Sequence, residues 1–116
     1  MIGVFVTFRY KDNFDEPSVR KIANAARATF ERMPGLRSKA FTFNARKREA
    51  TNFYVWESET AAKQFFTEGL LEQATALYGV RPIVDFVQIA ELVENGRADV
   101  VSGREAANAS QGDREI

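Results

Sequence analysis

Cysteine and histidine are both missing from the 116 residues of this chain. Their absence excludes a thiol nucleophile, a disulfide, a Cys/His zinc site, a Ser-His dyad and a histidine-ligated haem. It also removes the side chain that most often serves as a base near neutral pH. Any chemistry must therefore use carboxylates, tyrosine, lysine, arginine, amides or the substrate itself.

Net charge and long apolar runs are lacking as well. Lys and Arg total 16, as do Asp and Glu, so no long-range field draws the chain to nucleic acid or to acidic membranes. No apolar run approaches the roughly 20 residues that span a bilayer. The first ten residues lack the basic region and the small-residue cleavage site of a signal peptide. We therefore expect a cytoplasmic protein that binds neither nucleic acid nor membrane.

The residues that are present indicate one packed domain. The hydrophobic fraction is 45% and includes 10 Phe, which is typical of a globular protein with a single core. After about residue 95 the sequence becomes polar and nearly free of large apolar groups. We expect a folded domain over residues 1–95 and a polar C-terminal tail over residues 96–116.

Strand and helix signals alternate along this domain. β-branched and aromatic residues predict strands over 2–10, 36–45, 51–57 and 83–92, the middle two forming a hairpin. Pro17 is placed to open a first helix, and Ser58 to cap a second helical stretch that Gly69 interrupts. The order β-α-β-β-α-β predicts an α+β fold of the ferredoxin-like type, with a four-stranded antiparallel sheet.

Both faces of the predicted sheet carry apolar side chains. Val4, Val6 and Phe8 alternate with Phe5 and Thr7 in the first strand, and the last strand is apolar on both sides too. Two helices cover only one face, and the other would be an apolar patch that is uncommon in monomers. We expect a homodimer in which the uncovered sheet faces meet.

Three segments resemble a known family. They are "MPGLRSKAFTF", "FYVWESETAAKQFF" and "VDFVQIAELV", and they look like the dimeric α+β-barrel superfamily, which includes the antibiotic-biosynthesis-type monooxygenases. Within it the chain is most similar to the small YdhR-type mono-oxygenases, over about residues 1–95. The resemblance implies a homodimer with a small-molecule cavity between sheet and helices in each subunit.

The resemblance also bears on the chemistry. Some relatives oxidise aromatic polyketides to quinones with O2 and no metal or flavin, using a pocket asparagine and tryptophan four residues apart on one strand. Asn52 and Trp56 match that spacing. Other relatives degrade haem with a histidine and an asparagine on the first strand. This chain has no histidine and no asparagine before Asn13, which argues against haem degradation.

The face of the third strand that carries Asn52, Tyr54 and Trp56 is the candidate site. If residues 44 and 52 pair across the hairpin, small residues oppose these rings and leave a void, the usual form of a ligand site. We therefore predict catalytic roles for Asn52, Tyr54, Trp56 and Asp85. We predict substrate contacts for Ser38, Thr42, Asn44, Tyr78 and Arg81, with no metal and no cofactor.

Simpler roles are open for each of these residues. Tyr54 and Trp56 can fill the core, and Asn52 can hydrogen-bond a turn or strand edge. Asp85, on an apolar strand face, suits a base but can also form an ion pair with Arg81 or Arg37, or lie exposed at the strand end. Arg81 and Tyr78, before the last strand, can equally be rim residues.

The leading functional hypothesis is a cofactor-independent monooxygenase that oxidises a small electron-rich aromatic, such as a phenol or hydroquinone, with O2. A non-catalytic dimeric module that binds a small apolar ligand or a protein partner is the alternative. Lactone isomerisation, which related barrels perform, is a third option that no residue selects.

Overall fold

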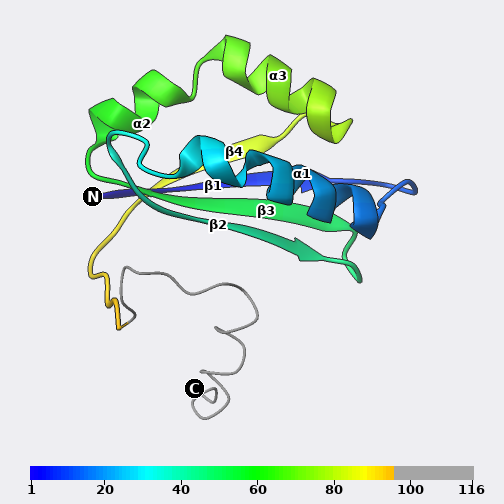
Figure 1. Cartoon of the computed structure of the whole chain (residues 1–116), viewed down its shortest axis with the longest axis horizontal. Coiled ribbons are helices and arrows are strands. Elements are labelled where there is room, and N and C mark those ends of the chain that lie inside the picture. Colours follow the sequence, from blue (N-terminus) through cyan, green and yellow to red (C-terminus); the bar gives the residue numbers. More distant parts are fainter. Residues whose placement is uncertain (96–116) are drawn as a thin grey trace.

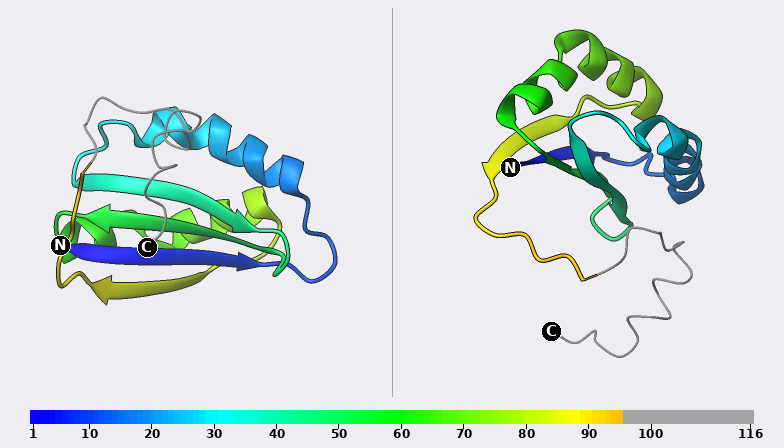
Figure 2. Two further views of the ribbon diagram at one scale, coloured as in Figure 1. Left: turned by 90° about the horizontal axis from the view of Figure 1, so that it is seen from below. Right: turned by 60° about the vertical axis from the view of Figure 1, so that its left-hand side comes forward.

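A four-stranded antiparallel sheet covered by helices on one face forms the body of the computed structural model, which describes residues 1–95 (Figure 1). The strands are β1 (Ile2–Arg9), β2 (Leu36–Asn44), β3 (Glu49–Trp56) and β4 (Ile83–Gln88), in the spatial order β2-β3-β1-β4. The helices are α1 (Glu16–Phe30), α2 (Glu59–Phe65) and α3 (Glu68–Tyr78). All three lie on the same side of the sheet (Figure 2). The predicted ferredoxin-like fold is confirmed.

Local signals in the sequence set most of the helix ends. Pro17 lies in the first turn of α1, and Ser58 Oγ accepts a hydrogen bond from the backbone N–H of Ala61 at 3.1 Å, as its role as N-cap predicts. Gly79 ends α3 in the left-handed conformation, at φ 87°. The predicted interruption at Gly69 is wrong by two residues. Thr67 Oγ1 instead accepts from the N–H of Leu70 at 3.2 Å and begins α3, so Gly69 lies inside that helix.

The core lies between the sheet and the helices. Alternate residues of β1 and β3 point to this side, where cross-strand pairs bring Val4 beside Tyr54 and Val6 beside Asn52. The buried side chains of the two strands on this face are Ile2, Val4, Val6, Phe8, Ala50, Asn52, Tyr54 and Trp56. The prediction that Asn52, Tyr54 and Trp56 share one face, turned toward the helices, is confirmed.

The register predicted for the β2–β3 hairpin is wrong. Asn44 pairs with Glu49 and not with Asn52, because the turn between the strands spans only residues 45–48. The β3 residue that pairs with Asn44 lies three positions earlier than predicted. A shift of the register by an odd number of residues places every side chain of β2 on the opposite face of the sheet relative to the side chains of β3.

Three side chains of β2, one lysine and two phenylalanines, change faces as a result. Lys39 pairs with Tyr54, Phe41 with Asn52 and Phe43 with Ala50, so these three side chains of β2 face the helices. Ser38, Ala40, Thr42 and Asn44 lie on the opposite face. The predicted register would place Phe41 and Phe43 on one face with Phe53 and Val55, and this placement is therefore wrong as well.

The face of the sheet away from the helices is partly apolar. Phe5 and Phe53 stack on it with ring centroids 4.6 Å apart, and Ile83 and Val87 of β4 extend it. A Cβ added to Gly3 would lie 3.0 Å from Val87 and 3.1 Å from Phe53, so the glycine lets these two side chains approach across β1. Phe5 is 39% exposed and Ile83 52%.

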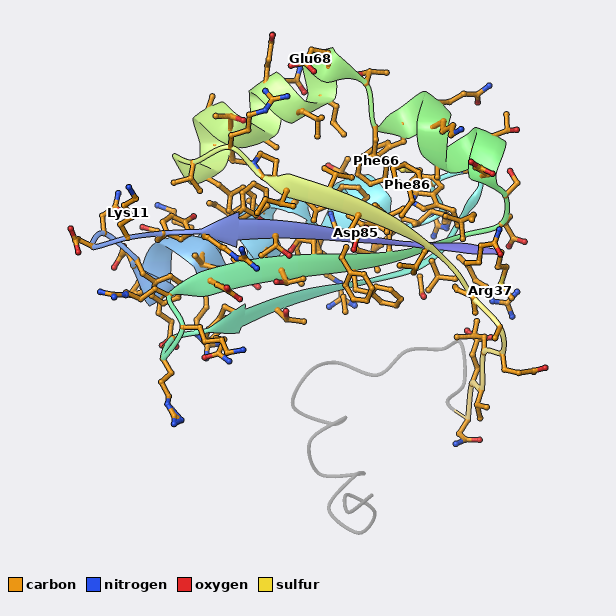
Figure 3. The ribbon with its side chains drawn as sticks, turned by 180° about the vertical axis from the view of Figure 1, so that it is seen from behind. Lys11, Arg37, Phe66, Glu68, Asp85 and Phe86 are labelled. Carbon is orange, nitrogen blue, oxygen red and sulfur yellow. The ribbon has the colours of Figure 1, made fainter. Side chains whose placement is uncertain are left out.

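The end of the described chain returns to the sheet. β4 stops at Gln88, four residues earlier than predicted, and Glu94 then pairs with Arg37 at 2.6 Å. Figure 3 shows Arg37 beside this segment. The predicted polar tail, residues 96–116, lies outside the described residues. Within residues 1–95, no helix combines the length and the apolar character needed to cross a bilayer.

The packing of the turn before β2 is testable by comparing two glycines with left-handed backbone. Gly35 lies in this turn, and Gly79, after α3, is the reference. A Cβ at Gly35 (φ 84°) would lie 2.9 Å from Ala61 Cβ, whereas one at Gly79 (φ 87°) meets nothing within 4 Å. We predict that Gly79→Ala costs about 1–2 kcal/mol through its backbone alone. Gly35→Ala should cost roughly 1–3 kcal/mol more through overpacking. Denaturant unfolding of the two variants measures the difference, and equal costs would contradict the packing of α2 against this turn.

Candidate functional site

A cavity of about 320 Å³ lies between the helix-facing side of the sheet, α1 and α3. We call it the inner cavity. Its walls are mainly aromatic and aliphatic, with Phe8 and Phe41 from the sheet, Phe30 from α1 and Phe66 from the α2–α3 junction. Figure 3 shows Phe66 next to Phe86 of β4, and their ring centroids are 5.9 Å apart. A concave apolar space of this size is typical of small-molecule sites.

A larger cleft of about 700 Å³, which we call the outer cleft, lies between α1 and β2. Charged residues line much of it, including Arg20 and Arg27 of α1 and Glu31, which follows the helix. The two spaces share part of their lining, namely Phe30, Lys39, Phe41, Asn52 and Tyr78. The polar members of this shared set are Lys39, Asn52 and Tyr78, and we call the part of the inner cavity that they line its polar end. The inner cavity meets the outer cleft there.

Asn52 and Tyr78 are held together at this polar end. The Asn52 side chain, 4% exposed, donates a hydrogen bond from Nδ2 to Tyr78 Oη at 3.2 Å. The Tyr78 ring stacks on Phe8 at 3.7 Å between centroids, and Tyr10 Oη donates to the Tyr78 carbonyl oxygen at 2.8 Å. These contacts fix the ring at the end of α3. Since Asn52 occupies one lone pair of Oη, the Tyr78 hydroxyl hydrogen is available to an acceptor in the cavity.

The Tyr78 hydroxyl stays protonated over a wide pH range. Burial raises its pKa, and the hydrogen bond from Asn52 acts weakly in the opposite direction. Burial also raises the pKa of Tyr54, with the nearby Tyr78 adding to the effect. Both phenols are therefore hydrogen-bond donors near neutral pH.

Tyr54 and Trp56 belong to a dense cluster of aromatic rings. Their own rings are nearly parallel, with centroids 6.1 Å apart, and Phe66 meets Tyr54 edge-on at 4.9 Å. Trp56 is 1% exposed, and its Nε1 has no hydrogen-bond partner among the described residues. It lines neither the inner cavity nor the outer cleft. Tyr54 forms part of the cavity wall, and Trp56 supports it from behind.

Lys39 is the unexpected member of the site. Its Nζ lies 3.3 Å from the Phe30 ring centroid, 4.2 Å from that of Phe41 and 4.3 Å from that of Tyr54. Within residues 1–95 no carboxylate forms an ion pair with it. Burial lowers the pKa of Lys39 from 10.5 to about 7. Near pH 7, Lys39 is therefore a neutral amine in a large fraction of the protein molecules, although the ring faces favour the ammonium form.

The structure brings together three of the predicted site residues. Asn52, Tyr54 and Tyr78 line the inner cavity. Ser38 and Thr42 contribute to the lining of the outer cleft from the edge strand β2, although they belong to its opposite face. Thr42 Oγ1 donates to the Thr51 carbonyl oxygen at 2.6 Å, across the hairpin.

The other predicted residues lie away from both spaces. Asn44 Oδ1 accepts from the backbone N–H of Lys47 at 3.1 Å and stabilises the hairpin turn. Asp85 pairs with Phe5 across β1 and β4, on the face away from the helices. Arg81 forms an ion pair with Glu68 at 2.9 Å, at the start of α3. The alternative ion pairs of Asp85 with Arg81 or Arg37 are wrong, since both arginines pair with glutamates. The other alternative is confirmed, because Asp85 is exposed.

Sequence reasoning missed Lys39. Lysine is rarely buried, and the predicted hairpin register placed its side of β2 away from Tyr54. One signal was available, because Lys39 alternates with Phe41 and Phe43 along a strand and period-two spacing puts all three on one face.

The described residues contain no cluster of three or more Asp, Glu, His or Cys side chains placed to bind a metal ion. The polar groups at the cavity are instead the amides of Asn52 and Gln73, two phenols, the Thr29 hydroxyl and the Lys39 amine. Such groups orient a ligand, donate hydrogen bonds and move protons. The fold and cavity together define a ferredoxin-like α+β protein with an aromatic-walled cavity between its sheet and helices.

Residues 4–91 match the model of the family described as "Putative mono-oxygenase ydhR". The match spans most of the chain, and the protein belongs to this family. No curated protein matches the sequence significantly.

Solved structures share the fold at low sequence identity. A variant of SnoaB, a cofactor-independent oxygenase from Streptomyces nogalater, is 16% identical with a TM-score of 0.59, covering 81% of this chain and 97% of that one. A monooxygenase from the gene ActVA-Orf6 of Streptomyces coelicolor, in complex with nanaomycin D, is 19% identical with a TM-score of 0.60, covering 82% and 92%. NE2512 from Nitrosomonas europaea, of unknown function, is 13% identical with a TM-score of 0.64, covering 83% and 95%.

The hydrogen bond between Asn52 and Tyr78 is testable by a double-mutant cycle. Tyr78→Phe leaves the buried Asn52 amide without its acceptor and should cost about 1–3 kcal/mol of unfolding free energy. Adding Asn52→Leu should then cost less than Asn52→Leu alone, with a coupling of about 1 kcal/mol. Denaturant unfolding of the four proteins measures this coupling. Additive costs would show that the two side chains do not interact. A cycle of Asn52→Leu with Lys63→Met, which changes an exposed lysine of α2, should be additive and serves as the control.

Proposed function

We propose that this protein is a cofactor-independent mono-oxygenase of small, electron-rich aromatic compounds such as polycyclic phenols and hydroquinones. The observation that carries the proposal is the inner cavity, where aromatic walls converge on the polar groups of Asn52, Tyr78 and Lys39. The walls suit a flat apolar ring system, and the polar end suits its oxygen atoms. Membership of the mono-oxygenase family supports this reading.

The proposed reaction uses the electron-donating power of the substrate. Once deprotonated, an electron-rich phenol can transfer an electron to O2 directly. O2 adds to a ring C–H carbon para to the phenolic oxygen, and the resulting hydroperoxide loses water as its O–O bond breaks. The C–H carbon becomes a carbonyl, so the phenol becomes a quinone, with one oxygen atom retained in the product and the other released as water. The protein would orient the substrate, exclude water and stabilise the negative charge on the phenolic oxygen.

Two residues are placed to stabilise that charge. The Tyr78 hydroxyl has its hydrogen free for an acceptor, because Asn52 Nδ2 donates to its oxygen. A hydrogen bond from Asn52 also makes Tyr78 a stronger donor, since hydrogen bonds in a chain polarise one another. Tyr54 would form the wall beside the substrate ring, with Trp56 holding Tyr54 in place. Asp85 and Arg81, which lie away from the cavity, have no part in the proposed reaction.

The cavity favours an enzyme over a purely structural or binding module. It is partly open to solvent and contains buried polar groups, whereas a closed, dry space would suit a structural role. An amine without a carboxylate partner among the described residues is costly to bury for ligand binding alone. A cytoplasmic location remains a prediction.

Oxygen uptake with a panel of polycyclic hydroquinones tests the proposal. The wild-type protein should consume O2 with at least one member. Asn52→Ala should reduce kcat by about 100-fold or more, because it removes a positioned group of the charge-stabilising pair. Trp56→Phe should have a smaller effect through the position of Tyr54. Asn13→Ala, in the exposed loop before α1, is the matched control and should leave the rate unchanged.

Two results would contradict the proposal. Wild-type protein that neither binds nor oxidises any panel member would argue against an aromatic substrate. Tight binding of a hydroquinone without oxygen consumption would instead identify a ligand-binding protein.

We further propose that a second copy of the chain covers the face of the sheet away from the helices. The stacked rings of Phe5 and Phe53, extended by Ile83 and Val87, form an apolar surface that no helix of the described chain covers. Burial of such a surface is the main driving force of association. An isologous dimer would cover both copies with one contact.

Light scattering after size-exclusion chromatography tests this dimer. The wild-type protein should show twice the chain mass of 13.1 kDa. The double variant Phe5→Lys, Ile83→Lys should shift to the monomer mass, because four lysines would meet at the contact. Leu77→Lys changes an apolar residue on α3 that is 59% exposed, and it should stay dimeric. A monomeric wild type, or a dimer unaffected by the double variant, would refute this interface.

A further inference from the structure

The reaction proposed above begins with the loss of a phenolic proton, and the inner cavity contains no histidine or carboxylate to accept it. Its titratable side chains are Lys39, Tyr54 and Tyr78. The two tyrosines are donors near neutral pH, as their raised pKa values show. Lys39 is therefore the candidate base among the residues that line the cavity.

The position of Lys39 suits this role. It comes from β2 and lies on the same face as Asn52 and Tyr54, with Tyr54 as its cross-strand partner. It lines both the inner cavity and the outer cleft, where Asn52 and Tyr78 are also found. A substrate whose oxygen accepts from Tyr78 would therefore lie in the space that the Lys39 amine borders.

We propose that the neutral amine of Lys39 is the general base of this site and removes the proton from a phenolic hydroxyl of the substrate. The inference rests on the proposed function. In this step the O–H bond breaks, its electron pair stays on oxygen, and a new N–H bond forms on Nζ. The products are a phenolate and an ammonium ion, and no oxidant takes part until O2 reacts with the phenolate.

The rings around Nζ serve both protonation states. The apolar rings replace water around Nζ and so favour the neutral amine before the transfer. The faces of Phe30, Phe41 and Tyr54 then stabilise the ammonium that the transfer creates. The new charge also lies near the phenolate, so the two ions stabilise each other in a site of low dielectric constant.

The charge state of Lys39 changes near neutral pH, where a base is most useful. Burial lowers its pKa to about 7. The charged groups that face it across the outer cleft belong to exposed ion pairs. These pairs are Arg20 with Glu16, Arg27 with Glu31, and Arg37 with Glu94. Arg32, which has no ion-pair partner within residues 1–95, lines the cleft as well.

Activity measurements on variants of Lys39 are the first test. For Lys39→Met, kcat/KM for oxygen uptake at pH 7 should fall by about 100-fold or more, the usual contribution of a general base. The wild-type rate should rise with pH through about 7, as the ammonium loses its proton, and the variant should lack this rise. Lys63→Met, which changes an exposed lysine of α2 paired with Glu59, should match the wild type in both respects.

Rescue separates a base from a structural lysine. Added ethylamine should restore part of the Lys39→Met activity, and a pH at which the substrate ionises by itself should bring the variant close to the wild type. Lys39→Arg keeps a cation in the aromatic site but provides no base at this pH, and it should be as inactive as Lys39→Met. If Lys39→Met does not fold, as judged by its unfolding transition, Lys39→Arg carries the same test. A variant within threefold of the wild type at pH 7 would overturn the proposal.

A second measurement does not depend on oxygen chemistry. Under nitrogen, 4-nitrophenol added at pH 6 should bind to the wild type partly as the phenolate, which its absorbance reveals, and to Lys39→Met as the neutral phenol. NMR titration of Lys39 Cε should show the amine changing charge near pH 7.

The two measurements distinguish the failure of each proposal. Phenolate formation without oxygen uptake would refute the mono-oxygenase function and leave the proton acceptor intact. Two results would overturn the role of Lys39 and leave the function intact, provided that the wild type consumes O2. One is that the wild type binds 4-nitrophenol in its neutral form, and the other is that Lys39 titrates near the usual lysine pKa of about 10.4.

Discussion

The four-residue turn between β2 and β3 closes with Asn44 opposite Glu49, and the side chains of the hairpin take their faces from that pairing. Arg48, at φ 56°, adopts the left-handed conformation in this turn, and the Asn44 side chain accepts a hydrogen bond from the backbone N–H of Lys47. A turn one residue longer or shorter would carry Lys39 away from Tyr54 and Asn52. The polar end of the cavity depends on this local geometry.

The site concentrates groups whose burial is unfavourable. An amide, two phenols and an amine lie among aromatic rings, and each must find a partner or lose free energy. Asn52 and Tyr78 satisfy each other, and the rings partly compensate Lys39. Trp56 Nε1 has no partner within the described chain, so its indole is retained for its ring contacts. Such a balance is typical of functional sites, where stability is lower than an apolar core would provide.

The two faces of the sheet have separate roles in this arrangement. The helix face holds the cavity, because α1 and α3 stand far enough from β1 and β3 to leave space above Asn52. The other face carries small residues on β2 and the ring pair of Phe5 and Phe53 on β1 and β3. Asp85, whose carboxylate suggested chemistry in the sequence, belongs to this second face.

Local chemistry in the sequence determined the element order, the Ser58 cap, the Gly79 helix end and the shared face of Asn52, Tyr54 and Trp56. Each of these follows from residues close together in the chain, where capping bonds and side-chain periodicity act. The tertiary structure alone decided the hairpin register, the meeting of Tyr78 with Asn52 and the aromatic surroundings of Lys39. These bring together residues of β2, β3, α1 and α3, and the pKa of Lys39 depends on burial by all of them. Burial is a property of the assembled fold, which no local pattern specifies.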